Sequence, residues 1–136
     1  MLTKIRKMMY RARGYLDGNL AGEPFRLDPY HSKFWRKAAA GTWEPDTFAV
    51  LDAHLDARHD YLDIGAWIGP TVLYGARKAR HVWCFEPDPE AFRALAWNID
   101  LNGLGASDAR EAASRVTNVV SKMGRRVAIV GMSGRS

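Results

Sequence analysis

The sequence predicts an α/β fold of the Rossmann-like kind, in which helices flank a parallel sheet of about three strands. Two observations lead to this prediction. Short apolar segments at residues 60–64 and 81–85 are each followed by a helical pattern, and such alternation is typical of parallel strands joined by right-handed crossovers. The first segment runs into a turn between Gly65 and Gly69, and the second ends at Glu86. Both features are typical of a nucleotide-binding half-site.

Composition and length narrow the class of protein. The chain has 136 residues and 47% hydrophobic content, which suits one compact folded domain. A single cysteine excludes an internal disulfide, and the histidines lack the spacing of metal ligands, so we expect no metal site. No apolar stretch is long enough to span a bilayer, and no apolar signal core opens the chain. We therefore expect a cytoplasmic protein with no integral membrane segment.

Residues 1–43 are predicted to form a basic N-terminal extension, and residues 44–136 the cofactor-binding domain. Within the extension, residues 2–16 carry apolar side chains at helical spacing with Lys and Arg between them, which predicts a short basic amphipathic helix. Such a helix can be a solvated surface element, or it can contact anionic lipid, nucleic acid or a phosphorylated substrate. Residues 17–32 are rich in Gly and Pro and are predicted to be a loop, and residues 33–40 a helix.

The elements of the domain follow in chain order. Pro45 suits the first turn of a helix, because its missing N–H costs nothing there. The apolar run at 81–85 suits a parallel strand buried on both faces. Asp88, followed by Pro89, is a helix cap. The predicted order is helix 45–57, strand 60–64, helix 70–79, strand 81–85 and a helix that runs from Asp88 to Asn102 and Gly103.

The C-terminal part is less regular. Residues 106–124 suit a helix by the spacing of their apolar side chains, and a strand by their β-branched residues. Residues 125–130 are predicted to be the third strand. A sheet of three strands leaves a parallel edge exposed, which predicts self-association or a partner chain along that edge.

The predicted ligand site lies where the strands end. Ligands of open α/β sheets bind beyond the carboxyl ends of the strands. Gly65 and Gly69 lie at that end of the first strand and let the backbone approach a ligand closely. The helix that follows directs its N-terminal N–H groups at the same place, and Thr71 can add a hydroxyl donor. Glu86 can accept hydrogen bonds from both hydroxyls of a ribose.

Two cofactors compete for this turn. The dinucleotide fingerprint G-x-G-x-x-G places Trp67 at its second glycine and Pro70 at its third, and Trp67 would obstruct a pyrophosphate. S-adenosylmethionine has no pyrophosphate and is the predicted cofactor. The remaining alternative is a tight strand-to-helix turn without any ligand. No residue is assigned as a catalytic base.

Four blocks in order resemble the opening half of the FkbM methyltransferase family: residues 41–48, 63–71, 85–89 and 98–102. The resemblance implies a seven-stranded class I methyltransferase fold. It also implies methyl transfer from S-adenosylmethionine, usually to a hydroxyl of a sugar, polyketide or other small metabolite. We accordingly expect a small-molecule acceptor and no nucleic-acid partner.

The resemblance also implies roles for individual residues. Asp63, Gly65 and Gly69 would form the first cofactor motif, Glu86 would bind the ribose, and Glu44 would reach the methionine end of the cofactor. The full set of expected cofactor-binding residues is Glu44, Asp63, Gly65, Ala66, Gly69, Thr71, Glu86 and Pro87. About three of seven strands are recognised. The chain is therefore either an incomplete methyltransferase, or a non-catalytic remnant that serves as an interaction module.

Overall fold

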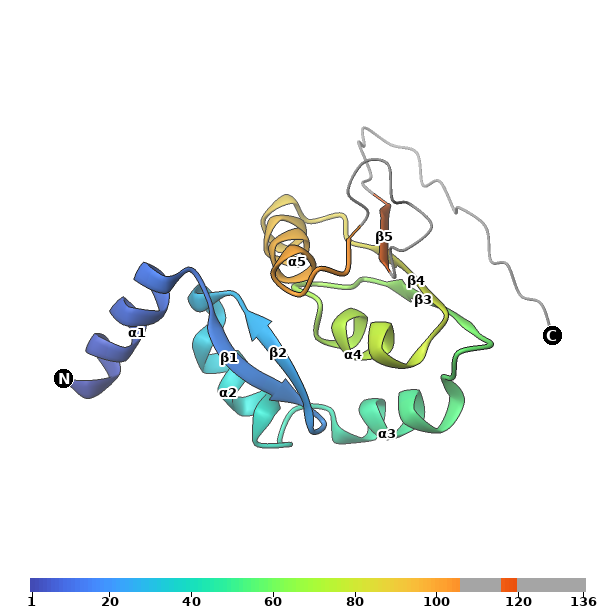
Figure 1. Cartoon of the computed structure of the whole chain (residues 1–136), viewed down its shortest axis with the longest axis horizontal. Helices are drawn as coiled ribbons and strands as arrows, with labels where there is room; N and C mark the ends of the chain where they lie inside the picture. The colour runs from blue at the N-terminus through green and yellow to red at the C-terminus, as the bar shows by residue number, and fades with distance from the viewer. Residues whose placement is uncertain (106–115, 120–136) are drawn as a thin grey trace.

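The computed structural model describes residues 1–105 and 116–119 (Figure 1). It contains a parallel sheet with helices packed beside it, preceded by an antiparallel hairpin and three helices. The helices are α1 (Leu2–Arg13), α2 (Ser32–Ala39), α3 (Pro45–His54), α4 (Pro70–Lys78) and α5 (Pro89–Leu101), with a short 3₁₀ turn η1 (Pro29–His31). The strands are β1 (Leu16–Leu20), β2 (Glu23–Leu27), β3 (Asp60–Ile64), β4 (His81–Phe85) and β5 (Val116–Val119).

The parallel sheet confirms the predicted fold class. Its strand order is β3-β4-β5, and Ile64 pairs with Phe85, which in turn pairs with Val119. The carboxyl ends of all three strands therefore meet at one edge. The third strand lies at 116–119, inside the segment for which both helix and strand were open, where β-branched residues gather. The strand predicted at 125–130 lies outside the described residues.

Helices α4 and α5 begin as the sequence predicts. Pro70 and Pro89 each occupy the first turn, where no intrahelical acceptor is lost. The Asp88 side chain accepts hydrogen bonds from the N–H groups of Glu90 (2.8 Å) and Ala91 (3.1 Å). Both helices contribute to a single buried core with β4, whose Cys84 is completely buried.

The hairpin β1–β2 corrects the prediction of a loop over 17–32. Its two-residue turn places Ala21 (φ 48°) and Gly22 (φ 87°) in the left-handed region, which matches the twist of paired strands. Gly18 lies within β1, at a position where a Cβ would lie only 2.7 Å from Leu27 Cδ1. The glycine is therefore explained by close packing between the two strands. The prediction of a loop was wrong because it rested on the Gly and Pro content alone.

The N-terminal helices agree with the prediction but are shorter than 2–16 and 45–57. Helix α1 ends at Gly14 in the left-handed conformation (φ 85°), whose N–H bonds to carbonyls of the last turn. The helix lies at one end of the molecule, away from the parallel sheet (Figure 1). In the described part of the chain, no helix combines the length and apolar character needed to cross a membrane.

Candidate functional site

The turn between β3 and α4 is fixed to the neighbouring strand by backbone hydrogen bonds. The N–H groups of Gly65 and Ala66 both donate to the carbonyl of Phe85, at 2.8 and 3.0 Å. Gly65 (φ 83°) and Gly69 (φ 104°) adopt positive φ, and so does Trp67 (φ 51°), a conformation that costs a bulky residue free energy. The turn is thus held in one shape at the carboxyl edge of the sheet.

The two glycines of the turn have different surroundings. A Cβ on Gly65 would meet no atom within 4 Å, so the backbone there is open to an approaching ligand. A Cβ on Gly69 would lie 2.8 Å from Leu95 Cδ1, because α5 packs against this point. Gly65 therefore leaves space for a ligand, and Gly69 leaves space for a helix.

Asp63 is buried at the end of β3 and accepts a hydrogen bond from the Thr71 hydroxyl. Burial raises the pKa of this carboxyl above its ordinary value, and the nearby charge of Glu86 adds to the increase. Hydrogen bonds from Thr71 and Tyr61 act in the opposite direction. The Thr71 hydroxyl, predicted as a ligand donor, joins the strand end to the first turn of α4 in this structure.

The raised pKa makes the stability of the protein depend on pH through Asp63. The carboxyl favours folding most below its ordinary pKa of 3.8, and this contribution is lost as pH rises through the higher folded-state pKa. We expect the free energy of unfolding of the wild type, minus that of Asp63→Asn, to fall over the pH range above 3.8. Urea unfolding across this range measures the difference. A difference that stays constant or grows with pH contradicts the assignment.

Glu86 connects the glycine turn to the segment after β4. One carboxylate oxygen accepts from the Trp67 N–H at 2.7 Å, and the other from the Asp88 N–H at 2.8 Å. Each oxygen has a further lone pair, so the carboxylate can still accept from a ligand. Glu86 is half-buried and Pro87 next to it is exposed.

A cavity of about 450 Å³ opens beside Glu86. It is lined by His31, Trp67, Ile68, Glu86, Asp88, Glu90 and Ala91. Only Glu86 was predicted from the sequence as a site residue. Asp88 was recognised as a helix cap, which explains its position at the cavity, and His31 gave no signal because it comes from a distant segment.

The Trp67 ring anchors the turn to the N-terminal region. Its centroid lies 4.6 Å from that of Phe34, 6.3 Å from His31 and 6.5 Å from Trp43. The contacts with Phe34 and His31 are edge-to-face and the contact with Trp43 is tilted; aromatic pairs of this kind contribute about 0.5–1.5 kcal/mol each. The aromatic contacts compensate for the left-handed backbone of Trp67.

Glu44 lies directly after Trp43 and is the first residue before α3. Its side chain is exposed, its backbone is left-handed (φ 41°), and its carboxylate accepts from the Thr47 hydroxyl at 3.2 Å. The structure thus places Glu44 in the cap of α3, while its neighbour Trp43 contacts the glycine turn.

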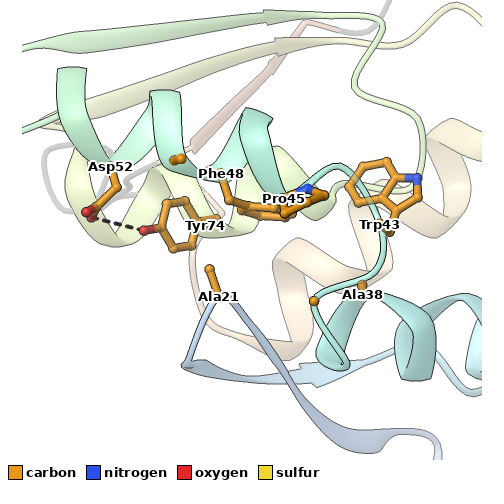
Figure 2. Close-up of a pocket in the computed structure, with 9 residues that line it drawn as sticks. Ala21, Ala38, Trp43, Pro45, Phe48, Asp52 and Tyr74 are labelled. Carbon is orange, nitrogen blue, oxygen red and sulfur yellow. Dashed lines mark hydrogen bonds between the residues drawn. The ribbon is translucent and has the colours of Figure 1, made fainter.

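A second cavity, of about 320 Å³, lies between the tip of the hairpin, α2, α3 and α4 (Figure 2). It is lined by Ala21, Ala38, Gly41, Trp43, Pro45, Phe48, Ala49, Asp52 and Tyr74. The Tyr74 hydroxyl donates to Asp52 at 3.1 Å across its wall. Sequence reasoning missed this cavity because its walls come from four separate segments.

A buried polar network supports the glycine turn from the N-terminal side. Asp28 is 1% exposed and accepts from the indole N–H of Trp35 (3.0 Å) and the side-chain amide of Asn98 (3.1 Å). The same amide donates to the carbonyl of Ile68 at 2.9 Å, and the Asn98 oxygen accepts from the Asp28 N–H at 2.7 Å. Asn98 therefore joins η1, α5 and the turn in one set of hydrogen bonds.

Comparison with known proteins establishes the fold. No family model matches the chain, and no curated protein matches it. The crystal structure of a tRNA m1G37 methyltransferase from M. jannaschii is similar, with a TM-score of 0.52, 16% identity and coverage of 79% of this chain and 30% of that one. The described part of the chain therefore has the Rossmann-like fold of class I methyltransferases, and the chain spans about a third of that enzyme's length.

Two further solved structures are similar at lower scores. Trm5b from Pyrococcus abyssi has a TM-score of 0.48 and 18% identity, over 77% of this chain and 27% of that one. The complex of aTrm5 with tRNALeu has a TM-score of 0.49 and 14% identity, over 76% and 27%. The prediction of no nucleic-acid partner is wrong, because the similar structures include a tRNA m1G37 methyltransferase and, at a lower score, a complex with tRNALeu.

Proposed function

We propose that this chain binds S-adenosylmethionine at the turn between β3 and α4 and forms the cofactor-binding part of a methyltransferase. The observation that carries the proposal is the position of the Glu86 carboxylate. The carboxylate is fixed by two backbone N–H groups at the end of β4, next to a glycine turn and beside a cavity of about 450 Å³. A carboxylate in this position binds ribose hydroxyls in folds of this type.

The residues of the turn fit this cofactor. Open space over Gly65 admits a ligand to the backbone. Trp67 has a left-handed backbone, and its N–H donates to Glu86. This N–H is therefore not available to bind a pyrophosphate. The first N–H groups of α4 have no intrahelical acceptor, which suits the cofactor's carboxylate.

When bound, S-adenosylmethionine would supply an electrophilic methyl group. The residues of this chain would hold it: Glu86 would accept from the ribose, and Gly65 would leave room above the backbone. Asp63 and Thr71 would keep the strand end and α4 in register. We assign no residue as a base, so the contribution of these residues to catalysis would be orientation.

Two separate indications bear on the acceptor of the methyl group, and each favours a different class of molecule. The four sequence blocks that resemble the FkbM family support a hydroxyl of a sugar or another small metabolite. A tRNA acceptor is the second candidate, because the similar M. jannaschii structure is a tRNA methyltransferase. The second indication is an analogy of fold, and a fold hosts many substrates.

Isothermal titration with S-adenosylhomocysteine tests the proposal. We expect saturable binding by the wild type, and a Kd about 10- to 150-fold higher for Glu86→Gln, since a hydrogen bond to a charged group contributes roughly 1.5–3 kcal/mol. Glu23→Gln on β2 makes the same change of charge away from the turn and is expected to bind like the wild type.

Two outcomes contradict the proposal. One is no binding by a wild-type chain that unfolds cooperatively, which would favour the non-catalytic interaction module. The other is equal weakening by Glu86→Gln and Glu23→Gln, which would show a general effect of charge. Thermal unfolding of all three proteins ensures that loss of binding is not loss of fold.

A further inference from the structure

Helix α1 exposes its apolar side chains to solvent. The exposed fractions are 78% for Leu2, 66% for Met8, 63% for Met9 and 42% for Ile5, and no residue of α1 is buried. At 3.6 residues per turn, these four side chains fall within one arc of about 120°. An apolar face of this kind normally packs against a core, but this one does not.

The opposite side of α1 contacts the rest of the protein. Tyr10 is half-buried and packs against the core, and Lys7 on the same side is half-buried too. The Arg11 guanidinium lies 4.8 Å from the centre of the Tyr30 ring in η1. These contacts fix the rotation of the helix so that the apolar arc faces away from the protein.

Cations border the apolar arc on both sides. At helical spacing, Lys4 lies at one border, and Arg6 and Arg13 follow the other. The helix contains no acidic residue. Among the described residues, the ion pair found for the cations of α1 is that of Arg13 with Asp17 of β1, at 2.9 Å. An outward apolar arc between two cationic borders is the pattern of a helix that lies in a lipid interface.

We propose that α1 docks the protein on membrane surfaces that contain anionic lipid. The apolar arc enters the boundary of the acyl chains, and the cations meet the headgroup phosphates on either side. An RNA would satisfy the cations but not the four apolar side chains. A second copy of α1 would place cations opposite cations, with no acidic residue between them. The proposal does not depend on the proposed methyltransferase function.

Co-sedimentation of the whole chain with vesicles tests the proposal. The vesicles are phosphatidylcholine with and without phosphatidylserine. We expect binding only with phosphatidylserine, and a reduction of about tenfold for the double variant Met8→Glu, Met9→Glu, which places charges in the apolar arc. The matched control is Val50→Glu, Ala53→Glu, two exposed positions on α3, which changes the net charge equally and is expected to bind like the wild type.

Three outcomes would overturn the proposal. Equal loss in both double variants would show that only net charge matters. Equal binding to vesicles with and without phosphatidylserine would remove the role of the cations. Binding of a tRNA hairpin in fluorescence anisotropy, without any binding to vesicles, would assign the helix to nucleic acid. Circular dichroism of each variant verifies that the helix is retained.

Discussion

Replacing Asp28 with alanine is expected to lower the free energy of unfolding by about 3–5 kcal/mol, because it breaks a buried hydrogen-bond network. Asp28 accepts from the Trp35 indole, the Asn98 amide and two backbone N–H groups of η1. In Asp28→Ala the Trp35 and Asn98 donors stay buried, and each buried donor left without an acceptor costs about 1–3 kcal/mol. Urea unfolding followed by tryptophan fluorescence measures the change.

Asp17→Ala is the matched control for this experiment. Asp17 is also an aspartate of the N-terminal region, but its side chain is 65% exposed and its pair with Arg13 lies in water. Exposed ion pairs contribute roughly 0–1 kcal/mol, so little change is expected. An Asp28→Ala protein within about 1 kcal/mol of the wild type would show that the network does not hold the hairpin to α5.

The two glycines of the turn are expected to separate stability from binding when each is changed to alanine. Gly69→Ala adds a left-handed alanine and a clash with Leu95, and should destabilise the protein by roughly 2–4 kcal/mol. Gly65→Ala meets no neighbour and carries only backbone strain, about 1–2 kcal/mol. Its methyl group, however, points into the space that the proposed ligand would occupy.

Gly65→Ala is therefore expected to weaken the binding of S-adenosylhomocysteine more than Gly69→Ala does, although Gly65→Ala is expected to be the more stable of the two variants. Titration at a temperature where both variants are folded, together with urea unfolding, gives the two readouts. The assignment of Gly65 to the ligand and Gly69 to packing is wrong if Gly65→Ala is the less stable protein, or if it binds as the wild type does.

The parallel sheet was predictable because its signals are local. The apolar runs at 60–64 and 81–85, the prolines that open α4 and α5, and the Asp88 cap each act within a few residues. The hairpin was not predictable from the same rules. Its strands have five residues each and contain Gly18 and Pro24, so composition indicated a loop, and only packing against Leu27 explains the glycine.

The candidate site was predictable in part for the same reason. Glycines and an acid at strand ends can be read in order along the chain, so Gly65 and Glu86 could be singled out. The cavity beside Glu86 also needs His31, which no local pattern connects with it. Thr71 was assigned to a ligand because sequence shows a donor but not its acceptor, and the structure pairs it with Asp63.

The hydrogen bonds between Asp28 and Asn98 join positions that are 70 residues apart. During synthesis the hairpin leaves the ribosome first, and it must wait for α5 before Asp28 can be buried. At 5–20 residues per second this interval is roughly 4–14 s. The hairpin is thus made before α5 but docked only after α5 has emerged, so its apolar strand faces stay without their partner during this interval.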